Sequence, residues 1–236
     1  MFAIYKKELR SYFVSPIGYI YVALFLAVSS LLFTYTTLYL GTCDVSTYYV
    51  FILYCFAILI PLLTMRMLSE EKKSKTEQIL LTSPVSLFGI IFAKYLAAYT
   101  LFAGTLLASS LQFFFFYTIP EAEPNFIIML CTTLGILLIG SAFVSLGIFI
   151  SACTENQLIS ALCTIIAIIA SLVLGALANY INFTPLRVIL KWISVFDRFY
   201  VFTDGYFDLV ALFYYISITV VFIFLTVRIY EKRRWE

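Results

Sequence analysis

The sequence contains no histidine and few charged residues. Histidine is absent from all 236 positions, and Asp, Glu, Lys and Arg together make up only 12% of the chain. The first absence removes the commonest metal ligand and the usual general base of enzymes. The second leaves too little polar surface to cover a globule in water, because soluble domains carry about 25% charged residues. Both absences argue against a soluble enzyme.

Several short motifs that carry chemistry in other proteins are also absent. There is no G-x-x-x-x-G-K-[ST] phosphate loop, no G-x-S-x-G nucleophile elbow and no H-E-x-x-H zinc motif. The five cysteines include no C-x-x-C pair and lie in or beside apolar runs, which favours packing over a metal or redox role. We therefore expect no catalytic, cofactor-binding or metal-binding residue, and no nucleic-acid partner. Energy for any transport must come from elsewhere.

The chain is rich in long apolar stretches. Hydrophobic residues make up 63% of it, and its mean hydropathy is +1.03. Six stretches are each long enough to cross about 30 Å of hydrocarbon as a helix that rises about 1.5 Å per residue. We predict an all-α polytopic membrane protein with six transmembrane helices, organised as a single transmembrane domain over residues 1–236. The six stretches are Ile17–Leu40, Tyr48–Met65, Leu87–Thr118, Phe126–Ile150, Leu158–Ile181 and Phe207–Val227.

Residues 1–15 are predicted to form an amphipathic helix that lies in the membrane interface. Apolar residues recur at helical spacing over three turns, and Lys6, Lys7 and Arg10 occupy the other face. The alternative is a polar lead-in to the first span. That span is too long for the apolar core of a signal peptide, so we expect it to be retained.

Basic residues predict the orientation of the chain. Most lie on the side of the N terminus, whereas Arg187, Lys191 and Arg198 lie on the other side, where acidic residues gather. The positive-inside rule therefore predicts a multi-pass protein of the plasma membrane with both termini cytoplasmic. It also makes residues 66–86 a cytoplasmic loop, and residues 182–206 an external interfacial or re-entrant segment.

The cytoplasmic loop contains the stretch SEEKKSKTEQILLTSPVS, residues 69–86, in which acidic and basic residues alternate in blocks. Ile79 and Leu80 form a small apolar knob inside this charged rim, and Pro84 ends the helical pattern. Such a surface suits docking into a partner's groove. The alternative is a solvated loop that only fixes topology, and the spacing of the residues leaves both open.

Polar and small residues inside the spans suggest two further roles. One set could line a transport pathway. The alternatives are that the lysine snorkels to the interface and that the amides hydrogen-bond between helices. The other is a small-residue stripe on the fifth span that suits an interface between subunits, with packing inside one chain as the alternative. The first set is Lys94, Gln112 and Asn179, and the second is Ala167, Ser171 and Gly175.

The stretch SEEKKSKTEQILLTSPVS resembles the cytoplasmic loop of type-2 ABC exporter permeases. That loop has an acidic pair, a small residue, Thr-x-Glu, two leucines and a proline, and this chain departs from it in two places. Lys75 stands where glycine is usual. Glu77 directly follows Thr76, whereas the glutamate of the Thr-x-Glu pattern would be at position 78, which Gln78 occupies. Three further segments resemble the gliding-motility-associated branch of this family or its common features: Tyr5–Tyr21, Gly147–Ala161 and Asp204–Trp235.

This resemblance implies a non-enzymatic permease that forms the translocation pathway of an exporter. It would pair with a second copy or a homologous permease, and with cytosolic ABC ATPase subunits that bind ATP and magnesium. In such exporters the N-terminal helix and the cytoplasmic loop contact the ATPase. The residues that would make this contact are Lys6, Lys7, Arg10, Glu70, Glu71, Lys72, Thr76, Ile79, Leu80 and Pro84.

Two other classes of function compete with this interpretation. One is an ion-driven secondary transporter, which the lack of histidine and of paired acids within the spans disfavours. The other is a non-transporting membrane scaffold or immunity protein, which the elaborate sequence of residues 69–86 disfavours. A copurifying ATPase would separate both from the exporter.

Overall fold

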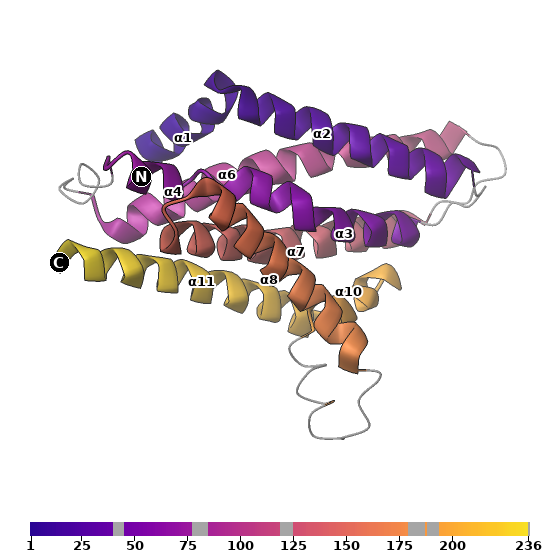
Figure 1. Ribbon diagram of the computed structural model, residues 1–236. Helices are drawn as coiled ribbons and strands as arrows, with labels where there is room; N and C mark the ends of the chain where they lie inside the picture. Colours follow the sequence, from indigo (N-terminus) through magenta and orange to yellow (C-terminus); the bar gives the residue numbers. More distant parts are fainter. Residues whose placement is uncertain (40–44, 77–84, 119–124, 179–186, 188–193, 236) are drawn as a thin grey trace.

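The computed structural model describes residues 1–39, 45–76, 85–118, 125–178, 187 and 194–235, and within these ranges it is helical and contains no strand. Six of its helices are long and apolar enough to cross a membrane. They lie side by side in one bundle, and both termini are at the same end of it (Figure 1). The predicted fold class and the predicted number of spans are therefore confirmed.

The helices follow the predicted stretches, with differences at their ends. The second span begins before its predicted start, at Val45, and the sixth continues past Val227 to Trp235. In chain order the elements are α1 (Phe2–Val14), α2 (Pro16–Phe33), the π-helix η1 (Thr34–Tyr39), α3 (Val45–Thr64), α4 (Ser69–Lys73), α6 (Leu87–Ser110), the 3₁₀-helix η2 (Leu111–Thr118), α7 (Phe126–Cys153), α8 (Gln157–Ala178), α10 (Val195–Thr203) and α11 (Leu209–Trp235).

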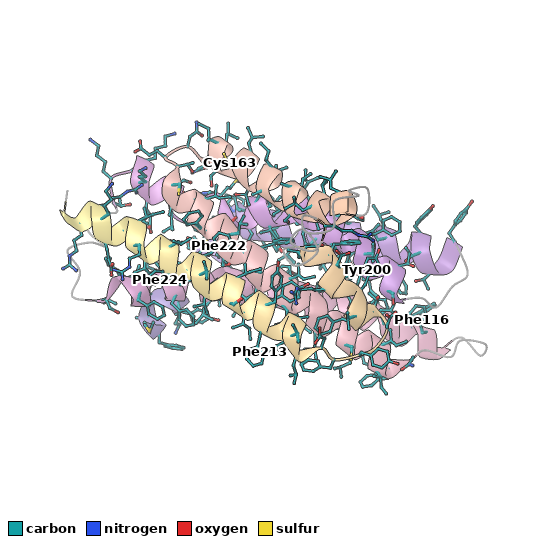
Figure 2. All side chains as sticks on the ribbon, turned by 90° about the horizontal axis from the view of Figure 1, so that it is seen from below. Phe116, Cys163, Tyr200, Phe213, Phe222 and Phe224 are labelled. Atoms are coloured by element: carbon teal, nitrogen blue, oxygen red, sulfur yellow. The ribbon has the colours of Figure 1, made fainter. Side chains whose placement is uncertain are left out.

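The central helix of the bundle is α7. It packs against α3, α6, α8, α10 and α11, and α11 makes its most extensive contact (Figure 1). Small residues recur along α7 and are buried, which lets its neighbours approach on several sides at once. The outer helices instead expose large apolar side chains, such as Phe213 and Phe224 on α11 (Figure 2). Exposed apolar faces of this extent suit a hydrocarbon surrounding.

A sharp corner separates α1 from α2. Ser15 has extended backbone, and Pro16 occupies the first turn of α2, where its missing N–H costs no helical hydrogen bond. Gly18 is required here, because a Cβ at this position would lie 2.2 Å from the carbonyl oxygen of Tyr12. Residues 2–14 thus form a helix, while the amphipathic character of this segment and its location in the membrane interface stay predictions.

The third span changes helix type near its end. The predicted stretch Leu87–Thr118 is longer than one crossing needs, and the structure divides it into α6 and the 3₁₀-helix η2. In a 3₁₀-helix residues i and i+3 lie on one face. Phe113 and Phe116 have this spacing and are buried, whereas Phe114 and Phe115 between them are exposed. The tighter winding thus places one pair of aromatic rings in the core.

The external segment predicted over residues 182–206 is described only in part. Residues 182–186 and 188–193, which contain the predicted helix start at Thr184-Pro185, lie outside the described residues. Helix α10 begins after Ser194, whose hydroxyl accepts a hydrogen bond from the Asp197 N–H at 3.2 Å. It buries Phe199 and Phe202 and packs on α7 and α8.

Candidate functional site

Three elements meet at the end of the bundle that holds both termini: α1, α4 and the first turns of α6 (Figure 1). The shortest of them, α4, follows α3 after a turn over residues 65–68. Its first turn carries Glu70 and Glu71 and its last turn Lys72 and Lys73. This order places negative charge near the positive end of the helix dipole and positive charge near the negative end. The sequence therefore favours a helix here despite its short length.

The N terminus of α4 is fixed to the end of α7. The hydroxyl oxygen of Ser151 accepts hydrogen bonds from the backbone N–H groups of Leu68 and Ser69, at 3.2 and 3.1 Å. These donors would otherwise be unsatisfied at a helix start, and both residues are buried. Lys72 adds an ion pair with Glu155 at 3.1 Å, in the turn between α7 and α8.

The C terminus of α4 ends in a Schellman motif. The N–H of Thr76 donates to the Glu71 carbonyl at 3.0 Å, and the N–H of Lys75 donates to the Lys72 carbonyl at 3.2 Å. Lys75 has a φ of 57°, the left-handed conformation that this motif needs. Glycine adopts it most easily, which accounts for the glycine that the resembling family places at this position.

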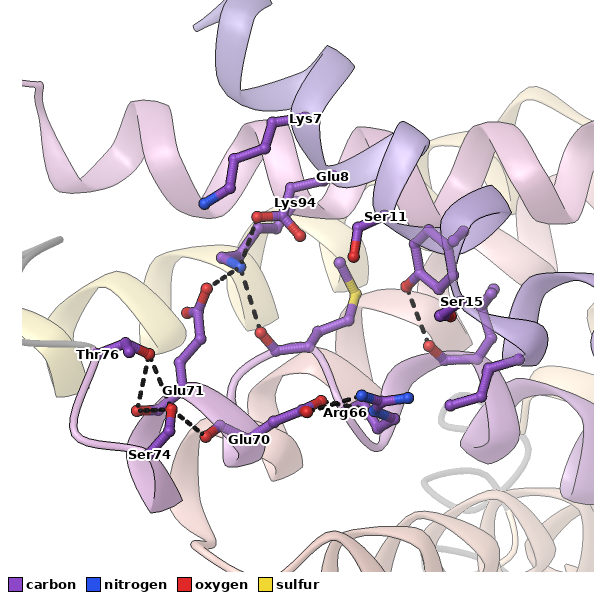
Figure 3. A pocket seen from close by; sticks show the side chains of 14 residues that line it. Lys7, Glu8, Ser11, Ser15, Arg66, Glu70, Glu71, Ser74, Thr76 and Lys94 are labelled. Atoms are coloured by element: carbon purple, nitrogen blue, oxygen red, sulfur yellow. Dashed lines mark hydrogen bonds and ion pairs between the residues drawn. The ribbon is translucent and has the colours of Figure 1, made fainter.

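The centre of the site is the Lys94 cluster, which consists of Lys94, Glu8, Glu71 and the Met67 carbonyl (Figure 3). The Lys94 Nζ lies 2.7 Å from Glu71 Oε1, 3.0 Å from Glu8 Oε1 and 3.3 Å from the Met67 oxygen. Lys94 is about two turns into α6, Glu8 is on α1 and Glu71 is on α4. The Lys94 side chain is 1% exposed, and those of Glu8 and Glu71 are 16% and 20% exposed.

Two further contacts frame this cluster. Arg66 makes a bidentate ion pair with Glu70, in which Nε lies 2.5 Å from Oε2 and Nη2 lies 2.7 Å from Oε1. Tyr12 on α1 donates its hydroxyl to the Leu63 carbonyl at 3.1 Å. Burial, and then the nearby Glu8 carboxylate, raise the pKa of Tyr12 above its ordinary value, so the hydroxyl stays protonated as a donor.

A cleft of about 310 Å³ opens between α1 and α4 beside these contacts (Figure 3). Charged groups of both signs line it together with the hydroxyls of Ser11, Ser74 and Thr76. Within the described residues, no group of three or more His, Cys, Asp or Glu could hold a metal ion. The arrangement offers polar and ionic contacts to a partner. The charged lining residues are Lys7, Glu8, Arg66, Glu70, Glu71 and Lys94.

The structure brings several of the predicted ATPase-contacting residues together. Lys7, Glu70, Glu71 and Thr76 line the cleft, whereas Lys72 pairs with Glu155 outside it. The other predicted residues are in two groups. Lys6 and Arg10 are exposed on α1, while Ile79, Leu80 and Pro84 lie outside the described residues.

Sequence reasoning missed Glu8 and Arg66 and did not connect Lys94 with Glu71. A signal for Glu8 was present, because it is the only acidic residue in residues 1–15, and Lys94 is the only charged residue in the third span. A lone buried charge requires a partner. Charge matching could therefore have suggested this pair.

The residues predicted to line a pathway do not form one group in the described part of the chain. Lys94 is held in the cluster, Gln112 is half-buried at the start of η2, and Asn179 lies outside the described residues. A pathway role for each stays a prediction.

The small-residue stripe on α8 is partly used inside the chain. Gly175 is buried, and a Cβ there would lie 2.3 Å from the Ser194 hydroxyl oxygen, so α10 occupies its surface. Ala167 and Ser171 are half-buried. Gly175 therefore allows the close approach of Ser194 from the same chain, while a role of Ala167 and Ser171 in an interface between subunits stays a prediction.

Comparison with known proteins gives one family. The model of a family described as "ABC-2 family transporter protein" matches residues 33–229, from the end of α2 to near the end of α11. No curated protein matches the chain. The matched region includes α4, Lys94 and the turn that contains Glu155, and it leaves out α1.

Proposed function

The chain belongs to the ABC-2 family of transporter proteins and is an ABC-type permease subunit, and from this premise we propose that a separate cytosolic ATPase drives it as part of an exporter. The chain itself has no phosphate loop in its sequence. ATP and magnesium would therefore bind to the partner subunits. As the membrane subunit, this chain would supply the translocation pathway and no chemistry of its own.

The observation that carries the proposal is the group of charged elements at one end of the bundle. Helix α4 and α1 flank a polar cleft there, and α4 is tied through Lys94 to the long helix α6. A partner that presses on α4 would therefore act on a transmembrane helix. Exposed groups on the last turn of α4 and after it, such as Lys73 and Thr76, would form part of the docking surface.

In this proposal the end that holds both termini faces the cytoplasm of a plasma-membrane protein. The excess of lysine and arginine near α1, α4 and the end of α11 supports that orientation, because cytoplasmic segments carry this excess. Helix α1 would lie in the inner interface. The active assembly would contain two permeases, either two copies of this chain or this chain and a homologue. Their membership of the gliding-motility-associated branch is part of the same proposal.

Copurification tests the ATPase partner directly. The tagged chain is solubilised from its own membranes, and bound proteins are identified by mass spectrometry and assayed for vanadate-sensitive ATP hydrolysis. We expect a protein with a phosphate loop, and we expect Lys73→Glu and Leu80→Asp each to reduce its recovery. Reversing the charge of an exposed docking residue, or adding charge to an apolar knob, would weaken the contact.

Asp204→Lys is the matched control, because Asp204 is an exposed charge at the opposite end of the bundle. It should leave recovery of the ATPase unchanged. If the wild-type chain brings down no ATPase and transport survives vanadate, the coupled-exporter proposal is wrong. Wild-type recovery with both docking variants would instead exclude residues 69–86 as the docking surface.

A further inference from the structure

Lys94 on α6 hydrogen-bonds to residues of two other helices, α1 and α4. Its ammonium has three N–H donors. The structure gives it three acceptors, which come from Glu8 on α1, from Glu71 on α4 and from the Met67 carbonyl in the turn before α4. Every donor is therefore used, and each acceptor lies on a different part of the chain.

The burial of Lys94 makes these contacts interdependent. A fully buried lysine is tolerated only when it is paired, and removing one partner of a buried ion pair leaves an uncompensated charge. If α1 moved away alone, Glu8 would leave the ammonium short of one acceptor inside the protein. If Lys94 were lost, the Glu8 and Glu71 carboxylates would face each other without a cation between them.

The surrounding charges do not replace Lys94. Arg66 is bound to Glu70 through two hydrogen bonds, and Lys72 is paired with Glu155. The remaining cation that lines the cleft is Lys7, whose side chain is exposed on α1 and extends toward the cluster (Figure 3). Lys7 has no acidic group to pair with on α6, because Lys94 is the only charged residue of that helix. Tyr5 donates a hydrogen bond to Thr100 at 3.4 Å, but this contact joins α1 and α6 alone. Within the described residues, only Lys94 joins all three elements.

We infer that Lys94 is a positioning residue that holds α1 and α4 on α6, so that these three elements move together. As a step in coupling, this role rests on the proposed function. A displacement of α4 would reach α6 through the Glu71–Lys94 contact, and α1 would follow through Glu8. The contact itself belongs to the folded chain and exists without a partner.

Distance measurement between spin labels tests this inference on the full chain in lipid nanodiscs. The five cysteines are replaced, and labels are placed at Ala3→Cys on α1 and Leu107→Cys on α6, which are both exposed. We expect one narrow distance distribution with Lys94, and a shifted and broadened distribution in Lys94→Met. Lys94→Arg should narrow the distribution again relative to Lys94→Met, because it keeps the positive charge and the N–H donors.

Two further variants separate this role from a general loss of folding. In the triple variant Lys94→Met, Glu8→Gln, Glu71→Gln no charge is buried, so the bundle should fold while the distribution stays broad. Arg228→Gln removes an exposed ion pair on α11 and should leave the distribution narrow. A narrow distribution in Lys94→Met or in the triple variant would overturn the inference.

The same labels separate the inference from the proposed function. With the copurified ATPase and ATP added, the wild-type chain should keep its narrow distance distribution, because α1 and α6 move together, whereas Lys94→Met should stay broad. The distances in the chain alone need no ATPase. Failure to find an ATPase would therefore contradict the proposed function and leave the role of Lys94 standing. A narrow distribution in Lys94→Met together with a copurifying ATPase would contradict the role of Lys94 and leave the proposed function standing.

Discussion

At the scale of single residues, Lys75 at the end of α4 stands where the resembling family has glycine. Lys75 occupies the left-handed position of a Schellman motif, where a side chain costs about 1 kcal/mol or more of backbone strain. The chain tolerates this cost because Thr76 and Lys75 satisfy the last carbonyls of α4. Lys75 thus has the backbone conformation that a Schellman motif requires at this position, but it carries a side chain where glycine is usual.

Lys75→Gly should stabilise the folded chain by about 0.5–1 kcal/mol. Glycine removes the backbone strain at positive φ, and its larger loss of conformational entropy on folding offsets part of this stabilisation. Thermal unfolding in detergent measures this effect. Lys75→Ala is the control, since it removes the charge and keeps the strain, and it should change stability little. A glycine variant less stable than the alanine variant would show that the Lys75 side chain itself holds α4.

At the scale of elements, α4 is a short helix that neighbouring elements support at both ends. The Ser151 hydroxyl accepts hydrogen bonds from the first backbone N–H groups of α4. Lys72 forms an ion pair with Glu155, and Glu71 forms one with Lys94. A five-residue helix is not stable alone. Its position therefore depends on α6, α7 and the turn before α8, and movement of α4 must be passed to them.

Ser151→Ala should loosen α4 from α7. It leaves the buried N–H groups of Leu68 and Ser69 without their acceptor, which costs about 1–3 kcal/mol. Hydrogen exchange followed by mass spectrometry should show faster exchange in a peptide that covers residues 66–76. Ser217→Ala removes an exposed hydroxyl on α11 and should leave that peptide unchanged. Wild-type protection in Ser151→Ala would mean that other contacts hold α4.

At the scale of the whole molecule, charge and apolar surface are distributed along one axis. Both termini, α1, α4 and the basic end of α11 are at one end, and the outer faces of the bundle carry exposed apolar side chains (Figures 1 and 2). This distribution suits a molecule that spans a bilayer with its charged end in one compartment. It leaves α10 and the start of α11 at the opposite end.

Labelling of single cysteines in intact cells tests this orientation. We expect Tyr206→Cys to react with a membrane-impermeant maleimide from outside, and Lys73→Cys to react only after the membrane is permeabilised. Both positions are exposed in the structure, so access depends on the side of the membrane. The opposite pattern of reactivity would reverse the proposed topology.

The sequence predicted the fold well where local physics controls it. Apolar length specifies the six spans, because a helix in hydrocarbon must satisfy its own backbone over a fixed thickness. The Ser15-Pro16 break and the helical spacing of residues 1–15 likewise predicted α1. The change to 3₁₀ winding at Leu111 was not predicted, because it depends on which of the aromatic rings find space in the core.

The candidate site divides in the same way. The sequence by itself determined that residues 69–76 are charged and helix-prone, that Lys94 lies alone in an apolar span and that the chain is a membrane protein. Only the tertiary structure decided that Lys94 meets Glu8, which is 86 positions away, and Glu71, which is 23 positions away. The reason is physical: hydropathy and helical period act within one segment, whereas a buried charge is satisfied by whichever partner the packing of separate helices brings within hydrogen-bond distance.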